Sequence, residues 1–370
     1  MLTYLGYFST SFVIAVIAWP FVSVVLTLPI LAGMYHRHHR LRFGAVLAAY
    51  LVVLYLLGLA AFTLYPLPDN PQAYCAAHHV TPQLNPLRFI TDIRTDGLYG
   101  LLQLVMNVVL FIPLGFALTR WARWKTWAVV AGGFLVSLAI ELSQLTGFWH
   151  LYPCAYRQFD VNDLMTNTLG AFLGVVLARL FSRISPPEQI DRDSINASPK
   201  LLHRAVTLAI DMFLISVAYF SIGAGAVLLL HSIAAPLPNG DYRLLGLTFG
   251  VETFTVITRV IAGLAFLVFE LWIPATHRGQ TLGGMFTHMT VETRKRSGNA
   301  RLVFYALRSV VLYALIQPGF SGSFSEANRV SFAVALVLII FWLIKRQMPY
   351  DLIPGEAEFE PEFKSEAGQH

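Results

Sequence analysis

The sequence predicts an all-α fold, a polytopic bundle of about nine membrane-spanning helices. The composition is 56% hydrophobic and only 13% charged, whereas soluble domains carry about 25% charged residues. A helix needs roughly 20 apolar residues to cross a bilayer core, while the strands of a membrane β-barrel would be about ten residues long. The expected spans are residues 10–33, 43–65, 98–119, 126–146, 161–181, 205–230, 252–274, 302–318 and 328–345.

The positions of Lys and Arg give the expected orientation of these spans. Basic residues collect at 36–42, 120–125, 183–204, 276–301 and 345–347, and cytoplasmic loops are the ones enriched in Lys and Arg. We therefore expect the N-terminus outside and the C-terminus inside. The formal net charge of +5 is mostly this topological signal, so we expect no nucleic-acid partner. The first span is too long for a secretory signal and has no Lys or Arg before it, so we interpret it as a membrane span.

Changes in composition divide the chain into two membrane domains. Residues 183–202 are polar and contain three prolines, which is typical of a linker, and the orientation places them in the cytoplasm. They separate a five-helix domain, residues 1–182, from a four-helix domain, residues 203–347. Residues 348–370 are acidic and interrupted by proline, so we expect a disordered tail.

The two cysteines, Cys75 and Cys154, lie in loops on the same predicted outer face. A disulfide between them is expected if that face is oxidising, and the alternative is two free thiols. His78, His79 and His150 lie nearby, but the spacing matches no standard zinc pattern. We therefore expect no metal and no cofactor.

Polar side chains occur in pairs on three of the predicted spans. The pairs are three or four residues apart and so share a helix face; they are Gln103 with Asn107, Glu141 with Gln144, and Asp163 with Asn167. At about 1.5 Å per residue, all lie within roughly 14 Å of the outer surface. Exposure to lipid would cost several kcal/mol for each group. The pairs should therefore face one another or a wet cavity.

Neighbouring residues are consistent with such a meeting point. Gly170 and Gly174 have the spacing that lets helices approach closely, and Pro113 should kink its helix and free a carbonyl near Val109. The pairs have two interpretations that the residues alone leave open, which are interhelical hydrogen bonding without a ligand and a pocket that binds one. In the second case the outer-loop residues Arg88, Arg94 and Arg157 are candidates to neutralise the carboxylates or to hold an anionic ligand.

Four ordered motifs in this first domain resemble the VanZ family of membrane proteins, named for a factor associated with low-level teicoplanin resistance. They are "NPLRFI" (85–90), "NVVLFIPLGF" (107–116), "SLAIELSQ" (137–144) and "RQFDVNDLMTNTLGAFLG" (157–174). The resemblance covers roughly residues 45–180. It implies a cell-envelope context, and its characteristic positions correspond to Asn85, Pro86, Asn107, Pro113, Gly115, Glu141, Gln144, Asp160, Asp163, Asn167 and Gly170.

The second domain has its own charged groups within or beside its spans. These residues, the second polar cluster, are Arg204, Asp211, Glu270 and Arg308. Opposite charges at similar depth on separate helices should pair, because an unpaired charge in a bilayer is costly. The deeper Arg259 has two candidate interactions, which are Asp211 and, by snorkelling outward, Glu252.

This domain resembles the RDD family, named for an arginine and two aspartates. The resemblance covers about residues 200–345 and rests on Arg204, Asp211, Arg308 and a GxTxG segment formed by Gly279, Thr281 and Gly283. Gly284 stands where many members carry lysine, and Glu270 is the nearest counterpart of the second aspartate. The resemblance implies transport or the binding of a partner.

Together these observations predict a multi-pass protein of the bacterial cytoplasmic membrane and favour a binding protein over an enzyme. The expected partners are membrane lipids and, by family analogy, an envelope lipid, a cell-wall precursor or a lipophilic glycopeptide. The candidate ligand-binding residues are Asn85, Arg88, Asn107, Glu141, Gln144, Arg157, Asp160, Asp163 and Asn167. The alternative is a secondary transporter or ion antiporter that uses the intramembrane carboxylates. A third class, an envelope enzyme with Glu141 and Asp163 as acid and base, lacks any accompanying catalytic motif.

Overall fold

The computed structural model describes residues 2–186, 194–238, 240–244, 246–316 and 326–358. Within these ranges nine helices are long and apolar enough to cross a membrane. They are Thr10–His38, Phe43–Leu64, Leu98–Arg120, Thr126–Leu145, Val161–Ile184, Leu201–Ile233, Glu252–Thr276, Gly298–Ile316 and Asn328–Lys345. The all-α polytopic fold is therefore confirmed. The orientation of the spans stays a prediction.

The residues pack into two compact units. The first contains Met1–Leu26 and Leu47–Gln189, and the second contains Thr27–Val46 and Ile190–His370. Helix α1 (Leu2–His38) contributes to both units. Residues 27–46 group with the second unit, although the sequence places them in the first domain, because Ala32 and Tyr35 share an apolar cluster with Val206. Within the expected linker 183–202, residues 187–193 lie outside the described ranges.

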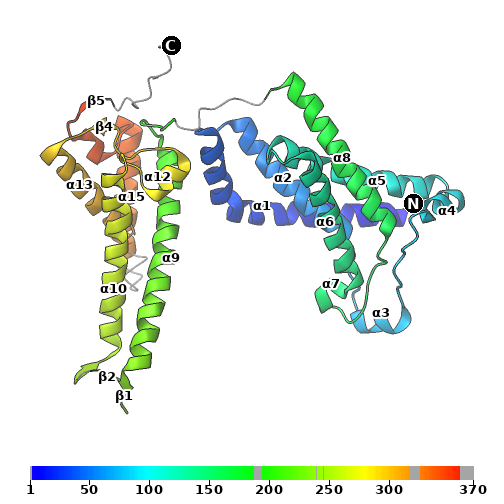
Figure 1. The fold of residues 1–370 in the computed structure, drawn as a ribbon, viewed down its shortest axis with the longest axis horizontal. Coiled ribbons are helices and arrows are strands. Elements are labelled where there is room, and N and C mark those ends of the chain that lie inside the picture. Colours follow the sequence, from blue (N-terminus) through cyan, green and yellow to red (C-terminus); the bar gives the residue numbers. More distant parts are fainter. Residues whose placement is uncertain (1, 187–193, 239, 245, 317–325, 359–370) are drawn as a thin grey trace, which may run out of the picture. The chain divides into compact units, whose positions relative to one another are not determined.

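The first unit contains seven further helices (Figure 1). They are α2 (Phe43–Leu64), α3 (Pro71–Ala77), α4 (Arg88–Asp96), α5 (Leu98–Arg120), α6 (Thr126–Leu145), α7 (Gly147–His150) and α8 (Val161–Ile184). Pro113 lies inside α5, where it cannot donate a backbone hydrogen bond. The hydroxyl of Tyr55 donates to the neighbouring carbonyl of Leu110 at 2.6 Å. A side chain of α2 thus bonds to the backbone of α5 close to the proline.

Helices α5 and α8 approach each other closely because glycine lines their contact. A Cβ atom on Gly170 would collide with the carbonyl oxygen of Val108, and one on Gly115 with the carbonyl oxygen of Ala171. Gly174 is equally crowded against the backbone of Ile112. The small residues predicted to allow close approach therefore do so. This contact brings the polar start of α8 against the polar residues of α5.

The second unit is built on four long helical segments and several short elements. They are α9 (Leu201–Ile233), α10 (Val251–Leu267), the π-helical turn η1 (Val268–Trp272), α11 (Ile273–Thr276), α12 (Leu282–Thr287), α13 (Gly298–Ile316), α15 (Glu326–Lys345) and the 3-10 turn η2 (Pro349–Leu352). Helices α10, η1 and α11 follow one another as a single predicted span, residues 252–274. The turn η1 interrupts its regular hydrogen bonding.

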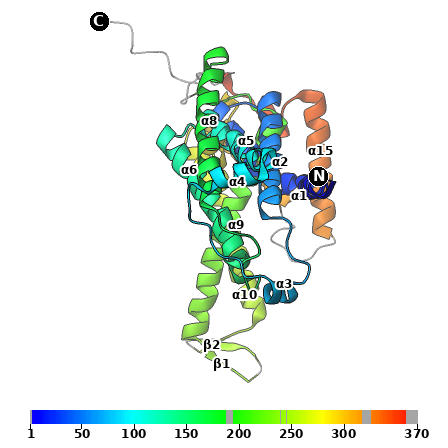
Figure 2. The ribbon, with the colours of Figure 1, turned by 90° about the vertical axis from the view of Figure 1, so that its right-hand side faces the viewer.

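The described residues of this unit include five short strands, which the sequence did not predict. Strands β1 (Ala235–Pro236), β2 (Tyr242–Leu244) and β3 (Leu247–Phe249) form an antiparallel sheet in the order β1-β2-β3. Figures 1 and 2 show this sheet at one end of α9 and α10. Strands β4 (Arg294–Lys295) and β5 (Glu356–Glu358) pair antiparallel. The pairing of β5 orders residues close to the C-terminus.

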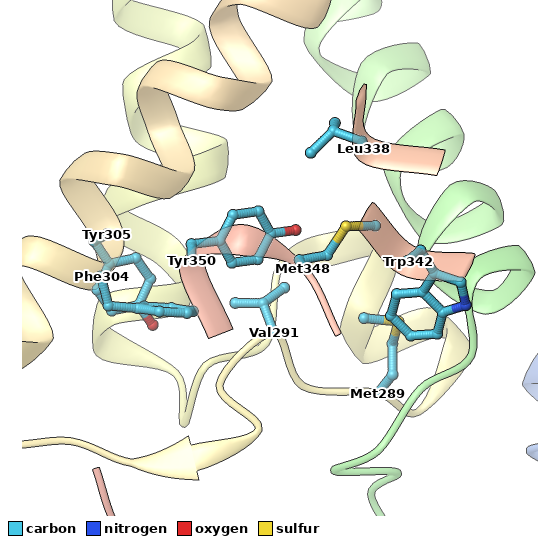
Figure 3. Close-up of a cluster of buried hydrophobic side chains, with 8 residues drawn as sticks. All are labelled: Met289, Val291, Phe304, Tyr305, Leu338, Trp342, Met348 and Tyr350. Carbon is cyan, nitrogen blue, oxygen red and sulfur yellow. The ribbon is translucent and has the colours of Figure 1, made fainter. Parts of the chain in front are cut away.

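The prediction that residues 348–370 form a disordered tail is wrong for residues 348–358. Met348 and Tyr350 are buried in an apolar cluster with Phe304 and Trp342 (Figure 3). Burying these side chains supplies the stabilisation that a disordered segment lacks. Burial also raises the pKa of the Tyr350 hydroxyl. Residues 359–370 of the expected tail lie outside the described ranges.

Candidate functional site

Two extended loop segments meet immediately before α8. The side chains of Cys75 in α3 and Cys154 are joined by a disulfide with an S–S distance of 1.99 Å. Gln83 and Asp160 form a parallel β-bridge, in which the backbone N–H of Gln83 donates to the carbonyl of Phe159 at 2.8 Å. The loop that follows α3 is therefore fixed against the segment that leads into α8.

Asp160 begins α8 and connects it to α6. Its carboxylate accepts hydrogen bonds from the backbone N–H of Asn162 at 2.7 Å and from the side-chain amide of Gln83 at 3.1 Å. A carboxylate at this position also stabilises the partial positive charge of the helix N-terminus. The backbone N–H of Asp160 donates to Oε2 of Glu141 at 2.9 Å. Glu141 is only 2% exposed, so α6 presents a buried carboxylate to the start of α8.

Two of the polar residues predicted on separate helices, Asn107 and Asp163, contact each other, whereas Gln103 of α5 is exposed. The side-chain amide of Asn107 in α5 donates to Oδ1 of Asp163 in α8 at 2.6 Å. One helical turn further along α8, the amide of Asn167 donates to the hydroxyl of Ser137 in α6 at 2.9 Å. These contacts show that the three helices meet at one level. Hydrogen bonding between helices is therefore one role of Asn107, Asp163 and Asn167.

We call Asn107, Glu141, Asp160, Asn162 and Asp163 the first polar cluster. It contains more hydrogen-bond acceptors than donors, because three of its five side chains are carboxylates. Oδ1 of Asn162 is buried and has no hydrogen-bond partner among the described residues. A buried polar atom without a partner costs about 1–3 kcal/mol. The cluster is therefore suited to a group that donates hydrogen bonds or carries positive charge.

The remaining predicted ligand-binding residues have other contacts. The side chains of Gln144 and Arg157 both donate to the carbonyl of Thr63, at 2.7 Å and 2.9 Å. They satisfy a carbonyl at the C-terminal end of α2, where a positive charge is favourable. Arg157 also interacts electrostatically with Glu141 and Asp163.

The two residues nearest the start of the first motif lie at the edge of the site. The side chain of Asn85 accepts from the backbone N–H of Leu87 at 3.0 Å and closes a turn, while its carbonyl accepts from the amide of Gln83 at 2.8 Å. Arg88 is an exposed residue of α4 whose closest carboxylate is Asp92, at 3.6 Å within the same helix. Arg88 therefore does not neutralise the carboxylates of the first polar cluster.

Sequence reasoning missed three side chains at this site. Gln83 is in a loop without periodicity, and Asn162 is a neutral residue between the charged Asp160 and Asp163. The hydroxyl of Tyr156 is buried and lacks a hydrogen-bond partner in the part of the chain that the structure describes. Burial raises the pKa of Tyr156, so this hydroxyl stays protonated and able to donate. The available signal for Asn162 was its position in the motif at 157–174, two residues after Asp160 and directly before Asp163.

The second polar cluster contains a buried ion pair. The guanidinium of Arg308 in α13 donates to Oε2 of Glu270 and also to the carbonyl of Glu270, both at 2.6 Å. The side chains are 5% and 0% exposed. Glu270 lies in the π-helical turn η1, and its other oxygen, Oε1, has no hydrogen-bond partner within the described residues. Turns of this kind occur frequently at functional sites.

Asp211 binds the glycine-rich segment and not a cation. Its two oxygens accept from the hydroxyl of Thr281 and from the backbone N–H of Gly283, both at 2.6 Å. A Cβ atom on Gly283 would lie 2.6 Å from the carbonyl oxygen of Thr207. Gly279 adopts a φ of +74°, which favours glycine. The GxTxG segment is therefore shaped to approach α9 and to enclose the carboxylate.

Arg204 pairs with a residue that the sequence assigned to the tail. Its guanidinium lies 2.8 Å from the carboxylate of Asp351 and 5.5 Å from the ring centroid of Trp342. Asp351 is 2% exposed. Arg204 and Asp211 therefore belong to separate networks, although both are in the second polar cluster.

Comparison with known proteins finds two families along the chain. The VanZ/LLP1 family matches residues 52–182, and the RDD family matches residues 198–355. The chain carries a VanZ-like domain and an RDD domain in tandem. Protein VanZ of Enterococcus faecium is 27% identical over 152 residues, which are 40% of this chain and 84% of that protein. No solved structure matches the chain.

Each polar cluster lies within the residues matched by one of the two families. The first polar cluster lies entirely within the VanZ-like match, and all four residues of the second lie within the RDD match. The chain is accordingly a multi-pass membrane protein with two family regions of this kind. Its VanZ-like region has the acceptor-rich site, whereas in its RDD region both oxygens of Asp211 and one oxygen of Glu270 are bound to protein donors.

Proposed function

We propose that this protein lies in the cytoplasmic membrane of a bacterium and binds the polar part of an envelope amphiphile in its VanZ-like region. The observation that carries the proposal is the excess of acceptors in the first polar cluster, together with the unpartnered Oδ1 of Asn162. Such a site favours hydroxyl or ammonium groups over phosphate or carboxylate. Sugars of a lipid-linked cell-wall precursor, of an envelope lipid or of a lipophilic glycopeptide carry these donors.

The proposed site faces the outer side of the membrane. The positive-inside rule supports this orientation, since the Lys-rich and Arg-rich loops lie at the opposite ends of α5, α6 and α8. The disulfide between Cys75 and Cys154 is consistent with an oxidising compartment. After reduction, a membrane-impermeant maleimide added from the outside should label both thiols. Labelling only after the membrane is permeabilised would reverse the orientation.

Native mass spectrometry of the full-length protein tests the binding proposal. The wild-type protein, released from membranes in mild detergent, should carry a ligand mass beyond ordinary phospholipid. The variant Glu141→Gln/Asp163→Asn keeps the shapes of the side chains, replaces two carboxyl groups by amides and should lose that mass. Asp92→Asn, which removes an exposed carboxylate outside the cluster, should retain it. Absence of the mass from wild type, or its retention in the double variant, contradicts the proposal.

A second candidate is transport of a proton or cation through the RDD region. It is favoured by Glu270, a fully buried carboxylate on a π-helical turn with one unpartnered oxygen among the described residues. Proteoliposomes with an internal pH-sensitive dye should then show flux driven by a pH gradient, and Glu270→Gln should abolish it. Wild-type vesicles without flux for protons, sodium or potassium eliminate this candidate and leave the binding proposal standing.

A further inference from the structure

A groove lies on the first unit along α6 and α8, away from the first polar cluster. Its volume is about 960 Å³, within the range of roughly 300–1,000 Å³ typical of small-molecule sites. Most of its lining is apolar and comes from Trp127, Val130, Ala131 and Phe134 of α6. From Trp127 to Phe134 the helix rises about 10 Å. The apolar part of the groove is therefore long enough to hold part of an extended hydrocarbon chain.

One end of the groove carries two cations. Lys125, at the start of α6, and Arg179 of α8 both line it. The guanidinium of Arg179 donates to the hydroxyl of Thr126 at 2.5 Å, which holds it beside Lys125. In the described structure neither cation forms a salt bridge with a carboxylate. An anionic group bound here would meet two positive charges next to an apolar surface.

Tryptophans mark the cationic end as the level of the lipid headgroups. Trp121, Trp124 and Trp127 are 42%, 48% and 71% exposed. Exposed tryptophans and basic residues gather at membrane interfaces, where the ring contacts hydrocarbon and the N–H group contacts water. The apolar part of the groove then runs from this interface toward the middle of the bilayer. The positive-inside rule assigns this end to the cytoplasmic side.

We infer that this groove is a binding site for an anionic phospholipid. The phosphate lies between Lys125 and Arg179, and one acyl chain lies along Trp127, Val130 and Phe134. Two cations favour a net anionic headgroup over a zwitterionic one, since an ammonium group would be repelled. Free phosphate would leave the apolar length of the groove unused. The site is separate from the acceptor-rich first polar cluster, which favours donors.

Lipid titration of the delipidated full-length protein tests this inference. Native mass spectrometry in detergent measures the apparent Kd for phosphatidylglycerol and for phosphatidylcholine with the same acyl chains. The wild-type protein should prefer phosphatidylglycerol. Lys125→Gln/Arg179→Gln should weaken phosphatidylglycerol binding by about 25-fold, because each cation near the membrane surface contributes roughly a fivefold factor. Binding of phosphatidylcholine should change much less.

Two control variants separate this site from general surface charge and from misfolding. Arg123→Gln/Arg183→Gln removes the same charge from the same end of the helices but does not alter the lining of the groove, and it should bind phosphatidylglycerol like wild type. Ala131→Trp keeps both cations and fills the apolar part, so it should weaken binding of both lipids. Equal loss in the two charge variants, or wild-type affinity in Lys125→Gln/Arg179→Gln, overturns the inference.

Discussion

Removing one partner of the ion pair between Glu270 and Arg308 should destabilise the RDD region strongly. The nitrogen and oxygen are 2.6 Å apart and both side chains are buried. At an effective dielectric constant of about 20, two unit charges at that separation attract by roughly 6 kcal/mol. Measured losses for breaking a buried pair are about 3–5 kcal/mol, because the remaining charge stays in a poor solvent. Arg308→Met should therefore cost about 4 kcal/mol.

A double-mutant cycle distinguishes this charge effect from loss of packing. Glu270→Gln should cost about 3 kcal/mol, since the amide oxygen still accepts from Arg308. The double variant Glu270→Gln/Arg308→Met leaves no buried charge, so it should be more stable than Arg308→Met alone. The assay is equilibrium unfolding of the purified protein in mixed micelles with increasing SDS, followed by tryptophan fluorescence.

Two outcomes of this cycle would refute the reasoning. If each single variant costs less than about 0.5 kcal/mol, the pair is reached by water or the residues are not buried. If the costs of the single variants simply add in the double variant, the two side chains do not interact. Either result would also remove the support that Glu270 gives to the transport candidate.

Two further predictions concern close packing and pH. Gly170→Leu should cost at least about 2 kcal/mol in the same unfolding assay, because its side chain would collide with the carbonyl of Val108. The control Gly58→Leu should be nearly neutral, since no atom lies within 4 Å of the Cβ position of Gly58. Burial raises the pKa of Tyr350, so its stabilising effect is present below about pH 10 and is lost as the pH rises. Unfolding free energy measured from pH 9 to 11 should fall less steeply for Tyr350→Phe than for wild type.

The membrane spans and the contact between Asn107 and Asp163 were predictable because each follows from a single local rule. Hydropathy defined the span 126–146, and the observed helix is Thr126–Leu145. Depth along each helix placed Asn107 and Asp163 within roughly 14 Å of the same surface, and the donor and acceptor atoms of their side chains are 2.6 Å apart. A bilayer penalises every exposed polar group, so residues at one depth on neighbouring helices are forced toward each other.

The loop contacts were not predictable, because no periodicity relates the residues that form them. Gln83 and Asp160 are 77 positions apart and meet through backbone hydrogen bonds that any sequence can make. The prediction of a disordered tail failed for a different reason. Its acidic residues dominate the average composition of 348–370 and mask the apolar Met348 and Tyr350, which fix the segment to the core. Composition averaged over a long window cannot detect such a short anchor.

The hydrogen bonding of the carboxylates separates the two functional candidates. Asp211 has both oxygens bound to protein donors, so it is best explained as a structural residue that holds the GxTxG segment. Glu270 has one bound oxygen and one without a partner in the described structure. Its free oxygen can still accept a hydrogen bond or bind a cation.

In the VanZ-like region the acceptor without a partner lies in the first polar cluster, where Asn162 Oδ1 lacks a donor in the described part of the chain. A bound ligand would regain the desolvation energy that this atom loses on folding. Variants of Glu270 and of the pair Glu141 and Asp163 should therefore give different phenotypes, the first affecting ion flux alone and the second ligand retention alone. If both sets of variants abolished the same activity, the two regions would have to be energetically coupled.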